Sequence, residues 1–293
     1  MNDLLANPFV RHLVWRSLVL PGLATLASGL ILLALTRNMR ERDTGSLWST
    51  PLLVGLLSGY FAVYRDWSLW PHTVLGWLPA LAVATILLTG WTARRNRWLA
   101  WVAVALLAAV ASGVMLQPLL QQGATLPVLR EWVVIALLWW LLWAGSACGR
   151  GDQRGAAASQ IVLAAGLAAA GPLSQSILLG QLAMVFGAAW AVVIALSWLR
   201  TDMPISTPAA DLGALVLGVL YIELWYYAAA PWRVVLALLV AAALGAAAQR
   251  LYQRTSPAHP LKRMLISAAV TALPAAIGVY YAWQAYATSG GGY

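Results

Sequence analysis

Long apolar stretches alternate with short polar connections along almost the whole chain. Many of these stretches approach the roughly 20 apolar residues that a helix needs to cross the hydrocarbon core of a bilayer. The pattern predicts an all-α, polytopic transmembrane helix bundle of about ten spans, forming one domain over residues 1–293 with no soluble domain. The expected spans cover residues 13–36, 47–64, 73–92, 98–116, 132–148, 156–171, 177–199, 212–229, 232–249 and 264–286.

The basic residues follow the odd-numbered spans. Thirteen lysines and arginines lie in the connections after the first, third, fifth, seventh and ninth expected spans, against three in the alternate connections: Arg65, Arg130 and Arg233. Because basic loops stay on the cytoplasmic side of a membrane, this asymmetry predicts that both termini lie outside. Arg11 and Arg16 are then external, and we expect them in an interfacial helix whose basic side chains reach lipid head groups.

The composition supports this interpretation. Hydrophobic residues make up 62% of the chain and charged residues 9%, whereas about a quarter of the residues in soluble domains are charged. The net charge of +9 comes from the connections, so it is a signal of topology and not of nucleic-acid binding. No connection exceeds about fifteen residues, which leaves no room for a nucleotide-binding or receptor domain.

Residues that carry enzyme chemistry are scarce within the expected spans. The histidines, His12, His72 and His259, fall at span edges or in connections, whereas a buried haem or an intramembrane protease needs histidine at depth. No His-Glu-x-x-His sequence is present, and the single cysteine, Cys148, excludes an intramolecular disulfide and a CxxC pair. We therefore expect no metal, no cofactor and no catalytic residue, and an enzyme is the weakest of three functional classes.

Glu223 is the one acidic residue clearly inside an expected span. A charged group at that depth costs several kcal/mol unless it is paired or neutralised, so Glu223 is a candidate ligand or proton site. Tyr226 and Tyr227 share its helical face, and we expect them to donate hydrogen bonds to the carboxyl group, while Arg233 can reach it from the outer connection. The alternative is a protonated side chain that joins helices by hydrogen bonding, and both interpretations stay open.

Aromatic residues concentrate near the outer ends of the expected spans. Tryptophan and tyrosine favour the membrane interface, so an ordinary interfacial belt is one interpretation. The other is a stacking surface for an amphipathic or glycan-like ligand at the outer leaflet. The tryptophans of this outer aromatic surface are Trp67, Trp70, Trp77, Trp225 and Trp232.

Two of the expected helices differ sharply in side-chain size. Residues 156–171 are almost entirely alanine and glycine, so neighbouring backbones can approach closely and we expect this helix at the centre. Residues 132–148 carry four tryptophans and several leucines, which indicates a peripheral helix or an aromatic wall. The small-xxx-small patterns Gly55–Gly59 and Ala241–Gly245 predict close helix pairing.

Four short motifs resemble an uncharacterised family of bacterial multi-pass inner-membrane proteins. The resemblance covers the second, third, eighth and ninth expected spans. It implies a location in the bacterial inner (plasma) membrane, and it implies no activity and no role for any residue. The motifs are Trp67-Ser-Leu-Trp70-Pro71, Gly76-Trp77-Leu78-Pro79, Tyr221-x-Glu223 and Pro231-Trp232.

Two functions fit these observations. A carrier or flippase-like protein for a small or amphipathic molecule fits the many spans, the absent soluble domain and the intramembrane acid. A non-catalytic membrane subunit or assembly factor of a larger complex accounts better for the scarcity of buried polar groups. The expected partners are the lipid bilayer and, in the second case, other membrane subunits, with no nucleic acid. A polar cavity that reaches Glu223 would favour the carrier, and a solid bundle with a flat apolar face the subunit.

Overall fold

The computed structural model describes residues 8–36, 47, 49–64, 68, 71, 73–93, 97–120, 125–147, 153–199, 205–255 and 260–289, and these contain helices and no strand. The helices form ten stretches, each of which overlaps one expected span. The first consists of α2 (Pro8–Val14), the π-helical turn η1 (Trp15–Val19) and α3 (Leu20–Leu35). The others are α5 (Ser49–Val63), η3 (Leu75–Trp77) with α6 (Leu78–Ala93), α7 (Arg97–Leu120), α8 (Thr125–Ala147), α9 (Arg154–Leu173), α10 (Ile177–Leu199), α11 (Thr207–Ile222) with the π-helical turn η4 (Glu223–Tyr227), α12 (Trp232–Thr255) and α13 (Pro260–Thr288).

Eight of these stretches are long and apolar enough to cross a membrane, which makes the chain a multi-pass membrane protein. α5 is a shorter apolar helix of 15 residues, and α8 is not among the eight. The structure therefore confirms the helical membrane bundle, whereas the count of ten spans stays a prediction. The eight candidate spans are Val10–Leu35, Leu75–Thr92, Trp98–Pro118, Arg154–Leu173, Ile177–Leu199, Thr207–Tyr227, Trp232–Tyr252 and Pro260–Thr288.

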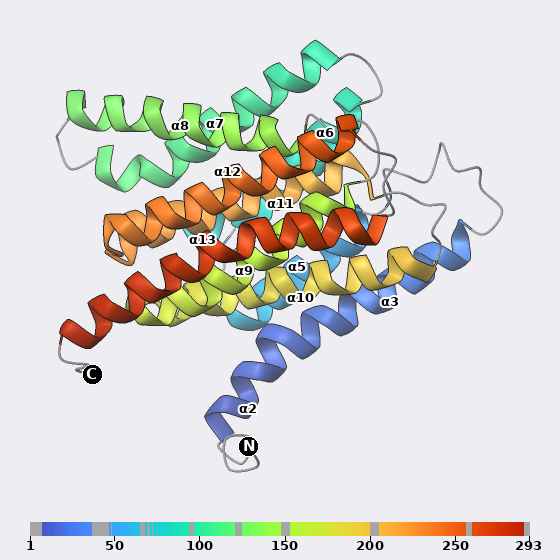
Figure 1. The fold of residues 1–293 in the computed structure, drawn as a ribbon, viewed down its shortest axis with the longest axis horizontal. Coiled ribbons are helices and arrows are strands. Elements are labelled where there is room, and N and C mark those ends of the chain that lie inside the picture. The colour runs from blue at the N-terminus through green and yellow to red at the C-terminus, as the bar shows by residue number, and fades with distance from the viewer. Residues whose placement is uncertain are drawn as a thin grey trace.

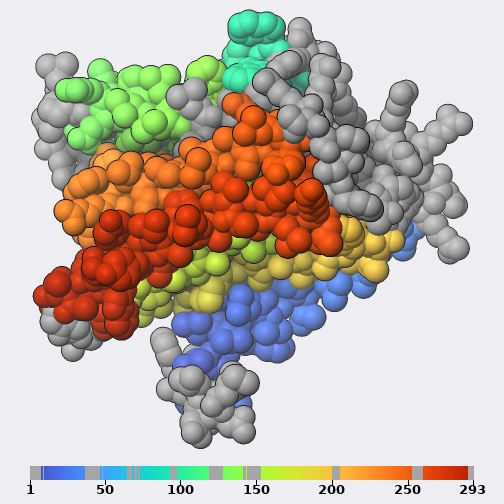
Figure 2. Space-filling view, in the orientation of Figure 1, coloured from blue at the N-terminus to red at the C-terminus, as the bar shows by residue number. Residues whose placement is uncertain are grey.

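The helices lie side by side as an elongated stack (Figure 1). The α7–α8 pair forms one edge and α2–α3 the opposite edge, with the remaining helices between them. α12 and α13 cover much of one face, which Figure 2 shows in orange and red. α11 contacts α6, α8 and α9, so it joins the α7–α8 edge to the centre of the bundle.

The alanine-rich helix α9 occupies the centre, as predicted. It contacts α10, α11, α12 and α13, and it buries residues such as Ala157, Ala164 and Gly166. A Cβ atom added to Gly166 would lie 3.1 Å from Leu238 Cδ2 of α12. Small side chains on α9 therefore let four helices approach it closely, which is how helices pack where the apolar surroundings supply no hydrophobic drive.

Glycines also allow the close pairing of α5. A side chain at Gly55 would overlap Thr25 of α3, and one at Gly59 would overlap Val185 of α10. Gly245 has a similar place between Thr271 of α13 and Ser159 of α9. Both small-xxx-small patterns therefore lie at tight helix contacts, as the sequence predicts.

α8 is peripheral on one face and aromatic on the other. Leu137 and Leu138 are exposed on its outer face, whereas Trp139 and Trp143 are buried against α11. The sequence leaves a peripheral helix and an aromatic wall as alternatives, and the structure combines them.

The two ends of the bundle differ in chemistry. Buried polar groups gather where α9 begins and α10 and α12 end: Gln249 Nε2 donates to Gln153 Oε1 (2.6 Å), and Arg154 Nη2 donates to the carbonyl of Ser197 (2.9 Å). We call this the arginine end, defined by Arg154, Arg250 and Arg263. Phenol groups gather at the opposite, tyrosine end, defined by Tyr60, Tyr64, Tyr226 and Tyr227.

α11 begins five residues earlier than expected. The prediction started this span at residue 212, but the helix begins at Thr207, with Ser206 at its N-cap and Pro208 in its first turn. Proline is favoured there because its missing N–H is one of the donors left unpaired at a helix start. The difference places Asp211 within the membrane helix and not in a connection.

Candidate functional site: a crevice along α11

The predicted site residues lie near the tyrosine end, but they do not form one cluster. Glu223 begins the π-helical turn and is partly buried, and no hydrogen bond or ion pair joins its carboxyl group to another residue of the described chain. Tyr226 donates instead to Glu131 Oε2 of α8 (3.1 Å), and Tyr227 donates to the carbonyl of Met115 of α7 (2.7 Å). The two phenols therefore hold η4 to the α7–α8 pair and do not donate to Glu223, contrary to the expectation.

Arg233 and the outer tryptophans are largely surface residues. The guanidinium group of Arg233 lies over the ring of Trp232, 5.7 Å from its centre, and both side chains are exposed. Trp225 stacks on Tyr226 with ring centres 5.8 Å apart, and Trp77 is half-buried in η3. Trp67 and Trp70 lie outside the residues that the structure describes.

A buried carboxyl group that hydrophobic patterning places in a connection lies where the first turns of α11 meet the last turns of α8. Asp211 is 3% exposed and accepts a hydrogen bond from Trp143 Nε1 at 2.8 Å. Trp143 itself is completely buried. An acidic residue at this depth is costly, so its hydrogen bond to an indole 68 residues earlier in the chain is a specific feature of the fold.

Two glycines of α11 leave space for large side chains of the neighbouring helices α8 and α9. A Cβ atom at Gly218 would overlap the indole of Trp139, and one at Gly213 would overlap the amide of Gln160. The side chains of Trp139 and Gln160 are both held by hydrogen bonds to the backbone of α11. Trp139 Nε1 donates to the carbonyl of Ala214 (3.1 Å), and Gln160 Nε2 donates to the carbonyl of Ala210 (3.0 Å).

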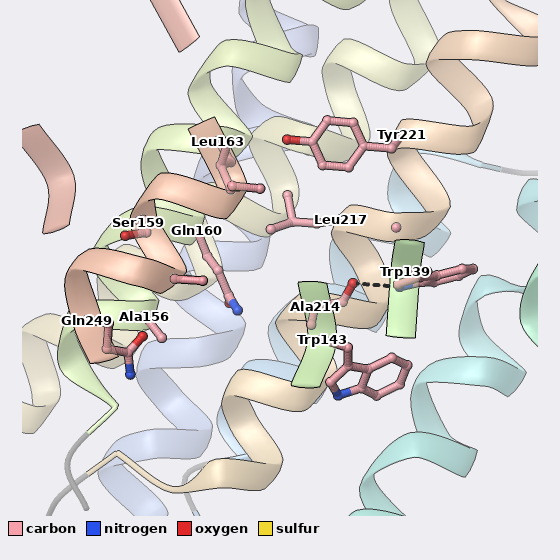
Figure 3. A pocket seen from close by; sticks show the side chains of 14 residues that line it. Trp139, Trp143, Ala156, Ser159, Gln160, Leu163, Ala214, Leu217, Tyr221 and Gln249 are labelled. Carbon is pink, nitrogen blue, oxygen red and sulfur yellow. Dashed lines mark hydrogen bonds between the residues drawn. The ribbon is translucent and has the colours of Figure 1, made fainter. Parts of the chain in front are cut away.

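These side chains surround a cavity between α8, α9, α11 and α12 (Figure 3). Its volume is about 60 Å³, several times the 10–15 Å³ or so that one water molecule requires. Figure 3 shows Ser159, Gln160 and Gln249 on one side and the indoles of Trp139 and Trp143 on the other. We call this the polar cavity.

A second cavity of about 60 Å³ continues toward the tyrosine end. It shares Trp139, Gly218 and Tyr221 with the polar cavity, and its walls are otherwise apolar or aromatic. We call it the apolar cavity, and the two together the crevice. The residues that line the apolar cavity alone are Ile135, Leu138, Ile222, Trp225, Tyr226, Val235 and Leu239.

The crevice follows one face of α11. Its lining residues on this helix recur every three or four positions from Ala214 to Trp225 and Tyr226. Eleven positions at 1.5 Å each make this face about 17 Å long. Leu138 and Trp225 are exposed beside the apolar cavity, and Leu138 lies near the middle of α8. The crevice therefore opens sideways near the middle of α8.

The lining of the crevice is uncharged among the residues that the structure describes. Two acidic residues lie one hydrogen bond behind the lining: Asp211 behind Trp143 of the polar cavity, and Glu131 behind Tyr226 of the apolar cavity. Arg154 directs its guanidinium group to Ser197 of α10, on a helix that does not line the crevice. Glu223 lies outside the lining of both cavities, so the polar cavity does not reach it, contrary to the expectation for a carrier.

No protein-family model matches the sequence, and no curated protein matches it at a significant level. The geometry of the crevice is therefore the basis for the functional argument.

Proposed function

We propose that this protein is a carrier or flippase-like protein of the bacterial inner membrane, and that it binds a small or amphipathic molecule in the crevice. The observation that carries the proposal is the crevice itself, which is uncharged, opens sideways and has amides at one end and aromatic rings at the other. An amphipathic molecule has the same division. Its head group needs buried hydrogen-bond partners, and its chain needs apolar walls.

The helices around the crevice are suited to admitting such a molecule from the bilayer. α8 and α12 form its two sides, and both carry exposed apolar side chains such as Leu138 and Leu236. The apolar chain of such a molecule, lying between α8 and α12, exchanges contacts with lipid for contacts with protein. The head group then reaches Gln160 and Gln249 without crossing a charged surface.

We also propose that the arginine end faces the cytoplasm and that both termini lie outside. The support is the excess of basic residues in the connections after the odd-numbered spans. Reporter fusions at Arg97 and at Gly123 are expected to report opposite compartments. Matching signals from the two fusions would overturn this orientation.

The proposed function is tested by reconstitution into proteoliposomes. Lipids with an NBD-labelled chain and a glucose, ethanolamine phosphate or glycerol phosphate head group are placed in both leaflets, and dithionite then bleaches the outer one. Full bleaching of at least one lipid is expected with the protein, against about half without it. Absence of movement for all three lipids would overturn the proposal.

A matched pair of substitutions on α12 locates the path. Ala246 lines the polar cavity, whereas the adjacent Ala247 is exposed on the other side of the helix. We expect Ala246→Leu to fill the cavity and slow lipid movement, and Ala247→Leu to leave it unchanged. Equal rates in the two variants would exclude the crevice as the path.

The alternative function, a membrane subunit, is favoured by a different surface. An open apolar groove between α7 and α8 has two adjoining hollows of about 470 and 300 Å³, lined by Trp98, Trp101 and Trp140 and by small residues including Ala105. Small residues let a further helix approach closely. If the protein holds a partner there, Ala105→Leu abolishes complementation of a deletion strain and Ala246→Leu does not. The carrier predicts the reverse.

A further inference from the structure

We infer that the crevice selects amphipathic molecules whose head group is uncharged and rich in hydrogen-bond donors, such as the hydroxyls of a glycerol or a sugar. This inference rests on the proposed function and names the class of molecule. It comes from the hydrogen bonds that the lining side chains already make within the protein.

The donors around the polar cavity are directed at the protein itself. Trp139 and Trp143 donate to the carbonyl of Ala214 and to Asp211, and Tyr221 donates to the carbonyl of Leu238 (3.0 Å). These three groups have no second hydrogen to offer a ligand.

The remaining polar side chains that line the polar cavity also donate to groups of the protein. Ser159 Oγ donates to the carbonyl of Ser267 (3.3 Å), and Gln249 Nε2 donates to Gln153. Gln160 Nε2 donates to the backbone of α11, which orients its amide and fixes which atom is the oxygen. In the described lining of the polar cavity, the second hydrogens of the two amide groups are the only side-chain donors that these bonds do not use.

The acceptors, in contrast, are available. Gln160 Oε1 is buried and has no hydrogen-bond partner in the described part of the chain. A buried acceptor without a partner costs roughly 1–3 kcal/mol, so a ligand hydroxyl that donates to this amide would remove a penalty of the empty protein. Gln160 lines the polar cavity, so a ligand hydroxyl bound there can approach this amide.

An anionic head group matches the hydrogen-bonding groups of the crevice poorly. Phosphate is an acceptor and needs donors or cations, and no lysine or arginine lines the crevice among the described residues. The carboxyl group of Asp211, one hydrogen bond behind Trp143, adds a repulsive charge if it is ionised. An ammonium head group would be buried without a carboxylate in the lining, which is also costly. An uncharged donor is the remaining match.

The test compares two lipids that differ by one phosphate. The full-length protein in detergent micelles is labelled with a monoacylglycerol that carries a diazirine in its acyl chain. Unlabelled 1-monoolein and 1-oleoyl-lysophosphatidic acid then compete with the probe. We expect monoolein to compete at a concentration at least about tenfold lower, because the phosphate loses hydration and gains no partner. Peptide mapping should place the adducts on α8, α11 and α12.

A substitution at Gln160 tests the amide directly. Gln160→Met keeps the length of the side chain and removes the acceptor, and we expect about tenfold weaker labelling, as for the loss of one buried hydrogen bond. Ile161→Met, next to Gln160 on the same helix and outside the lining of both cavities, is the matched control and should label normally. The competition experiment uses the wild-type protein, so it decides the selectivity even if Gln160→Met does not fold.

The outcomes separate the two proposals. Equal competition by the two lipids, or stronger competition by the lysophosphatidic acid, would overturn the selectivity and leave the crevice as a lipid site. Adducts outside the crevice, or no saturable labelling, would overturn the site of the proposed function as well.

Discussion

The hydrogen bond from Trp143 to Asp211 provides the sharpest test of how α8 packs on α11. Its donor and acceptor lie 2.8 Å apart, and both side chains are almost completely buried. Trp143→Phe removes the donor and keeps an aromatic ring, and Asp211→Leu removes the acceptor at similar size. Each single variant removes this hydrogen bond from a buried polar group, so each is expected to lower the free energy of unfolding by roughly 1–3 kcal/mol.

The double variant isolates the bond itself. Interhelical hydrogen bonds in membranes contribute about 0.6 kcal/mol on average and reach about 1.7 kcal/mol. This bond is short, buried and made to a carboxyl group, so we expect a coupling free energy near the upper value, about 1–1.7 kcal/mol. A coupling of about 1.4 kcal/mol changes the unfolding equilibrium constant tenfold.

The assay is unfolding by sodium dodecyl sulfate in mixed micelles, followed by circular dichroism. Trp140 supplies the control, because its Nε1 is buried on the same helix and has no hydrogen-bond partner in the described residues. Trp140→Phe combined with Asp211→Leu should be additive within about 0.3 kcal/mol. A Trp143–Asp211 coupling as small as that of the control would refute the reasoning.

Three further predictions use the same titration. Gly218→Ala should lower the free energy of unfolding by about 1–3 kcal/mol, because the added methyl group overlaps the rigid, buried indole of Trp139. An unchanged midpoint would contradict that overlap. Tyr227→Phe should cost about 0.6 kcal/mol through the lost bond to Met115, so a neutral result would argue against this anchor. Glu223→Gln should change the free energy of unfolding by less than about 0.5 kcal/mol, because the carboxyl group is partly exposed and has no partner in the described chain. A loss of lipid movement at normal stability would identify Glu223 as functional. A large loss of stability would contradict the structure.

Hydrophobic patterning predicts the helices of this fold well because every span must be apolar over its length. The central place of α9 and the tight contacts at Gly55 and Gly245 also follow from side-chain size alone. Hydrophobic patterning starts α11 too late, although Ser206 and Pro208 are the residues expected at an N-cap and a first turn. It therefore places Asp211 in a connection and gives no sign that this residue is buried.

The crevice itself lies beyond what one sequence can show. Gln160, Trp139 and Tyr221 are ordinary residues of apolar helices, and their joint role depends on which helix faces are neighbours. Trp143 and Asp211 are separated by 68 positions, and a hydrophobic pattern contains no information on such a pairing. The expectation that Tyr226 and Tyr227 would serve Glu223 failed for a related reason. Spacing along one helix predicts a shared face, but neighbouring helices offered these phenols other acceptors.

The π-helical turn at the end of α11 allows this helix to lose one residue. The amide of Ala228 donates to the carbonyl of Glu223, five residues back, so the turn holds one residue more than an α-helical turn needs. Deleting one residue within Glu223–Tyr227 converts the wide turn into a regular one and keeps the helix upstream in register with its neighbours. The same deletion between Leu212 and Val219 rotates every later side chain by about 100° and empties the face that lines the crevice. The end of α11, like η1 in the first helical stretch, is thus a position at which the chain can change length without changing the helix contacts that precede the turn.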